Sequence, residues 1–540
     1  MRSSFLGLEV SKRSIQMAQK ALDITGNNMG NAGVKGFTRQ RIDTTSLYLN
    51  SFTYWQTPLS KLSLAGQGVY AFGVSQIRND YIDKRYRDMV CYASEYDTKA
   101  KILKEIETSL DNIDNFGLLA AFDQLKSALQ QVSLSTPDAK EMCSLVRNEA
   151  VNICSMLRSY SAELDRLLEN NIVELKTSVD NANSLIDKIV QYNKSIVNEY
   201  ASTDYARIAS GQGVSEYGPL ELLDQRNVLL DELAEYGDIQ VFQNVDGSVR
   251  VTMGGVTIID GDKNEKIVLK SYEDYNAAVL TFSTGETFRP LSGEIKAYVD
   301  MVNGHGPYAV GKYQNSEYGI PYYKDALNAF AEDFAKLMNG VNASHLDNPV
   351  TWDRGLIWGD FAYDINGDIL LDINGNQVKA AVSAANIRVT DEWMARELMI
   401  GETYKPDPDN PDDPELGIWN GVWSVPNLQG SNLLRFVEAL ETDMNWGRAS
   451  DFNGTVFNYL QFLSNRMGQG INFVENQYDI VVDTVNTLLD NRDSISAVSD
   501  TEEGINMMTY QKWYNASARI MTTLDEALDV VINRMGRVGL

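Results

Sequence analysis

The chain has 540 residues, of which 44% are hydrophobic. It contains 47 Lys and Arg and 74 Asp and Glu, which gives a net charge of −27. So acidic a protein repels nucleic acid and anionic lipid, so we expect neither as a partner. The sequence has no apolar run of the roughly 18 residues that a transmembrane helix needs, so no membrane insertion is predicted. The length predicts several domains.

The charge is unevenly distributed. Residues 1–40 contain six basic and two acidic side chains, a net +4, and residues 501–540 contain four and five, a net −1. The remaining 460 residues therefore carry −30. We interpret the two ends as surfaces for protein contact and the middle as the solvated part. Residues 1–30 place charges among single apolar residues, so no cleaved secretory signal peptide is predicted.

The N-terminal segment has a helical seam whose spacings alternate between three and four residues, which is typical of a coiled coil. Its positions are Leu8, Ser11, Ile15, Ala18, Leu22, Thr25 and Met29. We expect the glycines that begin at Gly26 to break this helix.

A second layer of longer helices is predicted further along the chain. One runs from a cap at Thr136, with Pro137 in the first turn, to about Tyr200, and Asn193 is the polar residue of its seam. Asn193 either sets the register of the seam or faces solvent.

After this helix, the spacing of apolar residues changes from the helical pattern to the alternating pattern of β-strands. Residues 240–253, with Asp246-Gly247 between two alternating runs, predict a β-hairpin. Helices are predicted again over 322–343 and 456–488.

Residues 346–427 are the most irregular stretch, and they hold five of the eight tryptophans and the acidic, proline-rich tract 406–415. The tryptophans are Trp352, Trp358, Trp393, Trp419 and Trp423. They are read either as an ordinary core or as a glycan-binding, mucin-binding or catalytic surface. Asp364–Asp368 begins like a calcium loop, but Ile369 and Gly375 stand where that loop needs Gly and Glu, so two hairpin turns fit better.

The C-terminal segment mirrors the N-terminal one, with a possible cap at Asp500 or Thr501. Its stripe is formed by Tyr510, Tyr514, Ser517, Met521, Leu524, Leu528, Val531 and Met535. Each end offers one narrow apolar stripe and no second face. We therefore expect the ends to pack on each other, and to be disordered in the free monomer until assembly orders them.

Few residues offer chemistry. Cys143 and Cys154 lie eleven positions apart in one predicted helix, about 16 Å along its axis, so they cannot form a disulfide within the chain. Cys91 and the two histidines, His305 and His345, complete no metal-ligand or catalytic motif. We expect no enzyme activity, no metal and no cofactor.

The predicted fold is mainly α with a β-containing middle. Residues 1–55 and 494–540 form a discontinuous coiled-coil terminal domain. Residues 56–345 and 428–493 form a long helical bundle domain with β-hairpins, and residues 346–427 form an outward-facing, variable α+β or β domain.

Several segments resemble the flagellar rod, hook and hook-associated protein family. The Asn-rich stretch 21–32, the Gly36-Phe37-Thr38-Arg39-Gln40 turn and residues 494–503, which lead into the C-terminal helix, carry the resemblance. Thr38-Arg39-Gln40 and the stretch Leu222–Asn227 resemble the first hook–filament junction proteins, the FlgK family. A less favoured alternative is the hook protein itself.

This resemblance implies a structural adaptor between the bacterial flagellar hook and the filament, which assembles by coupled folding and polymerisation. It implies export without a cleaved signal peptide, through the flagellar type III channel, and an extracellular place at the junction. The implied partners are identical subunits in a ring, the hook protein, the second junction protein, and an export chaperone on the C-terminal helix. Asn27, Asn28, Gly36, Phe37 and Arg39, with both terminal stripes, are the candidate assembly residues.

Overall fold

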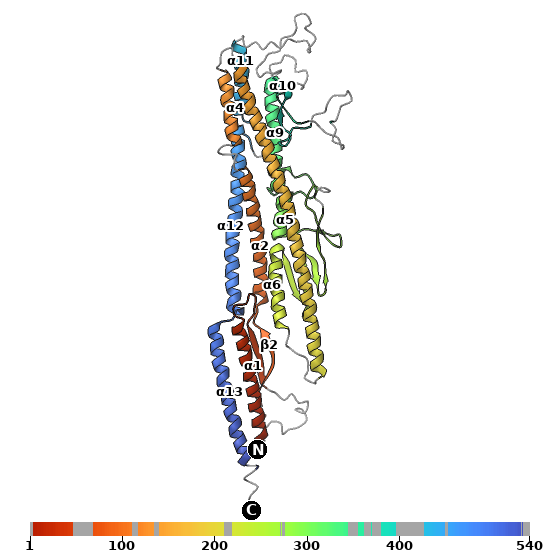
Figure 1. The fold of residues 1–540 in the computed structure, drawn as a ribbon, viewed down its shortest axis with the longest axis vertical. Coiled ribbons are helices and arrows are strands. Elements are labelled where there is room, and N and C mark those ends of the chain that lie inside the picture. The colour runs from red at the N-terminus through yellow and green to blue at the C-terminus, as the bar shows by residue number, and fades with distance from the viewer. Residues whose placement is uncertain are drawn as a thin grey trace, which may run out of the picture.

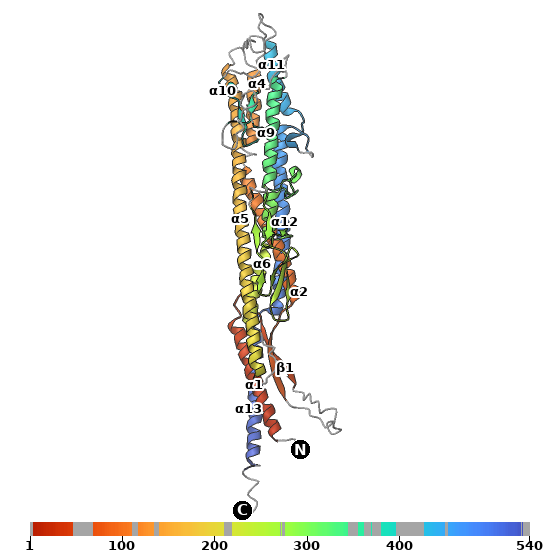
Figure 2. The same cartoon turned by 90° about the vertical axis from the view of Figure 1, so that its right-hand side faces the viewer.

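The computed structural model describes residues 4–46, 68–110, 117–133, 140–209, 219–270, 272, 276–343, 355–360, 369, 380–395, 426–448, 452–530 and 532. The described elements form a long, narrow molecule with both chain ends at the same end (Figure 1). A quarter turn shows the same narrow outline (Figure 2). Within the described part of the chain, no helix is long and apolar enough to cross a membrane.

The end that holds both termini is built from two helices and a hairpin. Helix α1 (Ser4–Gly30) lies along α13 (Asp500–Asp529). Strands β1 (Gln40–Ser46) and β2 (Val69–Gln76) pair antiparallel, with Gln40 opposite Gln76, and contact α1.

Long helices form the body of the molecule. Helix α12 (Val456–Ser496) packs along α2 (Asp80–Leu110), while α5 (Lys140–Ala209) runs most of the length of the body. Three further helices pack at the far end, and they are α4 (Leu118–Ser133), α9 (Ile320–Ala343) and α11 (Pro426–Glu441).

Small antiparallel sheets lie against the middle of α5. Helix α6 (Leu220–Tyr236) leads into a four-stranded sheet, a three-stranded sheet follows, and α8 (Glu294–Asn303) closes the unit. The strands are β3 (Ile239–Gln243), β4 (Val249–Met253), β5 (Val256–Asp260), β6 (Lys263–Asn264), β7 (Ile267–Leu269), β8 (Leu280–Phe282) and β9 (Thr287–Phe288). The predicted hairpin is confirmed, since β3 and β4 pair in register from Ile239–Met253 to Gln243–Val249.

Two apolar cores stabilise the body. One, at the far end, gathers aromatic side chains such as Phe330, which stacks on Tyr459 with ring centroids 5.6 Å apart. The other fills the space between α5, α6, α8 and the sheets. Burial of such large apolar surfaces is the main favourable contribution to folding.

The described parts of 346–427 join the first core. Strands β10 (Ile357–Trp358) and β11 (Arg388–Val389) pair, and the short helix α10 (Asp391–Met394) follows. Ile357 and Trp393 are buried in the same cluster as side chains of α5 and α9. Trp352, Trp419, Trp423 and the calcium-like loop at 364–368 lie outside the described residues.

The prediction of a mainly helical chain with small sheets is confirmed, and the domain limits stay predictions. The glycine-rich stretch ends α1 as predicted, at Gly30, while Gly26 lies within the helix. One local prediction was wrong. The cap of α13 is Ser499, whose hydroxyl accepts from the backbone N–H of Glu502. The predicted cap Thr136 lies outside the described residues.

Candidate functional site

The seam between α1 and α13 is built from small and polar side chains on the α1 side. The buried residues of α1 are Ser11, Ala18, Ala21, Thr25 and Asn28. Small side chains permit a close approach of the two helices. A Cβ on Gly7 would lie only 3.1 Å from Leu524 Cδ1 on α13. The spacing of three and four residues assigned this seam position to Leu22, so it did not predict that the neighbouring Ala21 is buried.

The structure places most of the predicted stripe residues at this seam. On α1, Leu8, Ile15 and Leu22 are half-buried and Ala18 is fully buried, but Met29 is 38% exposed. On α13, six of the predicted stripe residues are half-buried, namely Tyr510, Tyr514, Ser517, Met521, Leu524 and Leu528. The side chains of Val531 and Met535 lie outside the described residues.

The expectation of a single stripe on the C-terminal helix was wrong. Beside the seam, α13 exposes a second set of large apolar side chains, which we call the outer stripe. It consists of Ile505, Trp513, Ile520 and Val530, each between 44% and 55% exposed. Their spacing places them on one side of the helix, next to the seam, where they alternate with polar side chains such as Glu502 and Lys512. The pattern was missed because Lys512 and Thr523 interrupt it.

The turn after α1 needs glycine at one position. Gly36 has φ of +81°, and a Cβ there would lie 2.2 Å from Val228 Cγ2 on α6. A residue with a side chain is therefore excluded both by backbone conformation and by space. Gly36 is exposed and Phe37 is half-buried, and the turn brings the next three residues against other elements.

Gln40 ties the start of β1 to the end of α1. Its backbone N–H donates to Asn28 Oδ1 at 3.0 Å, and Asn28 Nδ2 donates to the Gln40 carbonyl at 2.9 Å. Asn28 is buried, so both of its polar groups are satisfied inside the protein. Asn27 is exposed, and its carbonyl oxygens accept from Asn31 Nδ2.

Arg39 ties the same turn to α13. Its Nε donates to Glu503 Oε1 at 2.8 Å, its Nη1 donates to Glu502 Oε2 at 2.6 Å, and its backbone N–H donates to the carbonyl of Ser496 at 2.9 Å. Burial lowers the pKa of Arg39, but the two carboxylates outweigh it and raise the pKa above its ordinary value. Arg39 thus stays charged and fixes the link between α12 and α13.

A second group of charges lies where α2 begins and α12 ends. Asp231 on α6 accepts from Arg87 Nε of α2 and from Arg492 Nη1 of α12, each at 2.7 Å. The guanidinium of Arg492 also lies 4.3 Å from the ring centroid of Tyr86. These contacts join three helices at the same level as the turn.

The arrangement offers contact surface and a joint held by hydrogen bonds and ion pairs. The described residues contain no group of three or more His, Cys, Asp or Glu side chains that could hold a metal ion. The described cysteines, Cys91 and Cys154, are buried, and burial raises the pKa of each thiol to about 12.

Comparisons with known proteins agree with this organisation. The family model described as "Flagellar hook-associated protein FlgK helical domain" matches residues 103–350. Flagellar hook-associated protein 1 of Bacillus subtilis is 28% identical over 566 residues, covering 100% of each chain. The protein of the same name from Escherichia coli is 22% identical, over 96% of this chain and 98% of that one.

Residues 103–350 thus resemble the FlgK helical domain, and the two relatives extend the similarity over almost the whole chain. The solved structure of the flagellar hook junction protein FlgK from Burkholderia pseudomallei has a TM-score of 0.55 to this chain, at 12% identity. The match covers 76% of this chain and 100% of that one, and it shows a shared fold.

The FlgK helical-domain match and the terminal helices occupy different parts of the molecule. Residues 103–350 include α4, α5, α6, the middle sheets, α8 and α9. Helices α1 and α13 lie outside that span, but the full-length alignment to the Bacillus subtilis protein includes them. The full-length alignment therefore includes the residues of the seam and of its polar joint, whereas the helical-domain match does not include α1 or α13.

Proposed function

We propose that this chain is a non-enzymatic structural subunit that joins the bacterial flagellar hook to the filament. Full-length similarity to proteins named flagellar hook-associated protein 1 supports the proposal. The observation that carries the mechanism is the outer stripe on α13, which is large, apolar and exposed beside the seam with α1. Such a surface is typical of a site that another protein covers.

Assembly is the proposed mechanism, with folding of the ends coupled to polymerisation. The α1–α13 pair buries small side chains along a thin seam, so the pair alone gains little from burial. Contacts of the outer stripe with neighbouring subunits would add the missing apolar burial. The proposed partners are identical subunits, the hook protein and the second junction protein. Before assembly, an export chaperone would cover α13.

The charge distribution supports an extracellular place in the flagellum. The segment 1–40 has a net charge of +4 and 501–540 has −1, whereas the region between them carries −30. The two ends together carry only +4 − 1 = +3, which favours close packing of many copies, and the acidic middle keeps the outside of an assembly solvated. We propose export through the flagellar type III channel, without a cleaved signal peptide.

Deletion of the gene in the cells that make this chain tests the proposal. We expect electron micrographs to show complete hooks without filaments, and immunoblots to show flagellin in the culture medium. Intact filaments in the deletion strain would contradict the junction function, and missing hooks would instead indicate a rod or hook component.

Leu524→Asp tests the seam within the same strain. The half-buried Leu524 contacts Gly7, so a charge there separates α13 from α1. We expect the variant to be made at normal levels but not to restore filaments, whereas the wild-type gene restores them. Normal filaments with Leu524→Asp would refute the function proposed for the seam.

A further inference from the structure

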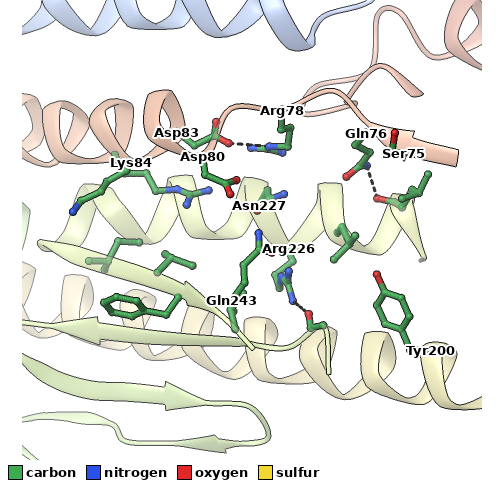
Figure 3. A pocket seen from close by; sticks show the side chains of 18 of the residues that line it. Ser75, Gln76, Arg78, Asp80, Asp83, Lys84, Tyr200, Arg226, Asn227 and Gln243 are labelled. Carbon is green, nitrogen blue, oxygen red and sulfur yellow. Dashed lines mark hydrogen bonds and ion pairs between the residues drawn. The ribbon is translucent and has the colours of Figure 1, made fainter. Parts of the chain in front are cut away.

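A cavity of about 700 Å³ lies at the joint between the terminal end and the body. Its walls come from the end of β2, the first turns of α2, helix α6 and the β3–β4 hairpin (Figure 3). Small-molecule sites in proteins have volumes of roughly 300 to 1,000 Å³. The cavity is separate from the seam and the outer stripe.

Arg226 is the most unusual residue of this cavity. Its side chain reaches from α6 toward the hairpin turn, where Nη1 donates to the carbonyl of Gly247 at 2.7 Å and to Asn193 Oδ1 at 3.1 Å (Figure 3). Only 2% of the residue is exposed. Both acceptors are uncharged, and Nε has no hydrogen-bond partner among the described residues. A buried guanidinium without a carboxylate is costly, because desolvation is not offset by an opposite charge.

Arg87 supplies a second available donor. Its Nε is held by Asp231, but its Nη2 is buried with no hydrogen-bond partner in the described part of the chain. The residue is 7% exposed and lines the same cavity. Burial, with the positive charges of Arg87 and Arg78 adding to it, lowers the pKa of Arg226 to about 10. The cavity lining has four basic side chains, Arg78, Lys84, Arg87 and Arg226, and two acidic ones, Asp80 and Asp83.

The nearby carboxylates already have partners. Asp246 in the hairpin turn acts on Arg226 electrostatically and opposes the lowering of its pKa, and Asp246 Oδ1 accepts from the backbone N–H and the hydroxyl of Ser248. Asp83 accepts from Arg78 Nε at 2.9 Å, and Asp231 accepts from Arg87 and Arg492. Asp80 lies at the rim of the cavity, where it is exposed and solvated. None of these acids forms an ion pair with Arg226 in the described structure.

We propose that this cavity binds a small oxyanion, a carboxylate or a phosphate group, with Arg226 as its principal donor. Guanidinium groups recognise such anions through charge-assisted N–H donors in a fixed plane. A bound anion would place a negative charge beside Arg226 and Arg87, whose Nε and Nη2 are costly to leave buried and unpaired. Leu223, Val241 and Phe242 on the walls would contact the apolar part of an organic anion.

Binding here would stiffen the joint that carries the terminal helices. Gln76, at the end of β2, donates to the carbonyl of Leu220 at 2.9 Å, and both residues line the cavity. An anion between α2, α6 and the hairpin would add a second connection at the same level. This inference does not depend on the proposed junction function, and its failure would leave that proposal unaffected.

Isothermal titration calorimetry of the full-length chain tests the proposal, with inorganic phosphate and acetate in separate titrations. The ionic strength is held constant with chloride, because screening alone changes charge interactions. We expect saturable binding of at least one anion. Stronger binding of phosphate would identify a phosphoryl ligand, and stronger binding of acetate would identify a carboxylate.

Variants then assign the donor. Arg226→Gln is expected to weaken binding at least tenfold. Arg166→Gln removes the same charge from an exposed position on α5 and is expected to leave the affinity unchanged. Arg87→Lys keeps the positive charge but loses the Nη2 donor, so it is expected to weaken anion binding several-fold. This variant tests the site independently of Arg226→Gln, which removes the bond to the hairpin turn. Absence of saturable binding to the wild-type chain would overturn the proposal. Wild-type affinity in both the Arg226→Gln and the Arg87→Lys variants would also overturn it.

Discussion

Thr38 and Asp224 connect the terminal end of the molecule to its body across 186 positions of sequence. The backbone N–H of Thr38 donates to Asp224 Oδ2 at 3.0 Å, and its hydroxyl donates to Oδ1 at 2.6 Å. Both residues are buried. Burial raises the pKa of Asp224 above its ordinary value, and the two bonds from Thr38 partly oppose that rise. The turn after α1 is thus held on α6 by one carboxylate.

Thr38→Val removes the hydroxyl while keeping the shape of the side chain. We expect the free energy of local opening of residues 36–46 to fall by about 1 to 3 kcal/mol, because a buried carboxylate loses one of its donors. Hydrogen exchange followed by mass spectrometry measures this opening. Thr108→Val on α2, where the hydroxyl is exposed, is the matched control and should change exchange little.

The effect of Thr38→Val is expected to depend on pH. Loss of a donor to the charged form raises the folded-state pKa of Asp224 further. A raised carboxyl pKa favours the folded state at low pH, and this contribution is lost as the pH rises through the folded-state value. The penalty should therefore be larger at neutral pH than below about 4, where the carboxyl is protonated. An equal penalty at both pH values would contradict the pairing.

Periodicity predicted the helices because it is a local property of the sequence. The spacings of three and four located α1, α5, α12 and α13, and alternation located the β3–β4 hairpin. The joint was not predictable in this way, since Asp224 and its partner Thr38 show no shared pattern. The position of Glu502 and Glu503 in the first turn of α13 does not indicate that both pair with Arg39, as they do in the structure.

Asn193 shows the same limit. Its place in a helical seam suggested either a register-setting residue or a solvent-facing one. The structure buries it, and its Nδ2 donates to the carbonyls of Val249 and Gly261 on the neighbouring sheet. A polar residue in an apolar seam indicated a buried partner, but only the tertiary structure identifies a strand and its turn as that partner.

The two acidic partners of Arg39 are expected to differ in importance. The side chain of Glu503 is 3% exposed and that of Glu502 is 61% exposed. Glu503→Gln leaves Arg39 facing a neutral group in a buried place, so local stability around residues 496–506 should fall by about 2 to 4 kcal/mol. Glu502→Gln removes an exposed pair and should cost less than about 1 kcal/mol. Hydrogen exchange over 496–506 compares them, and equal losses would contradict this assignment.

Cys91 and Cys154 are expected to be inert in the folded protein. Burial raises the pKa of each thiol to about 12, so almost no reactive thiolate is present at pH 8. Iodoacetamide labelling followed by peptide mapping should find both residues unmodified in buffer and fully modified in denaturant. Rapid labelling of either residue in the native protein would show that α2 or α5 opens more readily than its burial indicates.

Ile520→Asp separates the outer stripe from the seam. Ile520 is 53% exposed, so the charge should leave the helix content and the α1–α13 pairing of the free chain unchanged, as judged by circular dichroism and hydrogen exchange. In the assembled structure the same charge would be buried without a partner, which is strongly unfavourable. We therefore expect the variant to fail to restore filaments in the deletion strain.

Thr522→Asp is the matched control for Ile520→Asp. It introduces the same charge two positions away, where Thr522 lies on the exposed polar side of α13. We expect this variant to restore more filaments than Ile520→Asp at equal protein levels, counted by electron microscopy. Normal filaments with Ile520→Asp would show that the outer stripe stays exposed after assembly, and the partner surface would then have to lie elsewhere on the molecule.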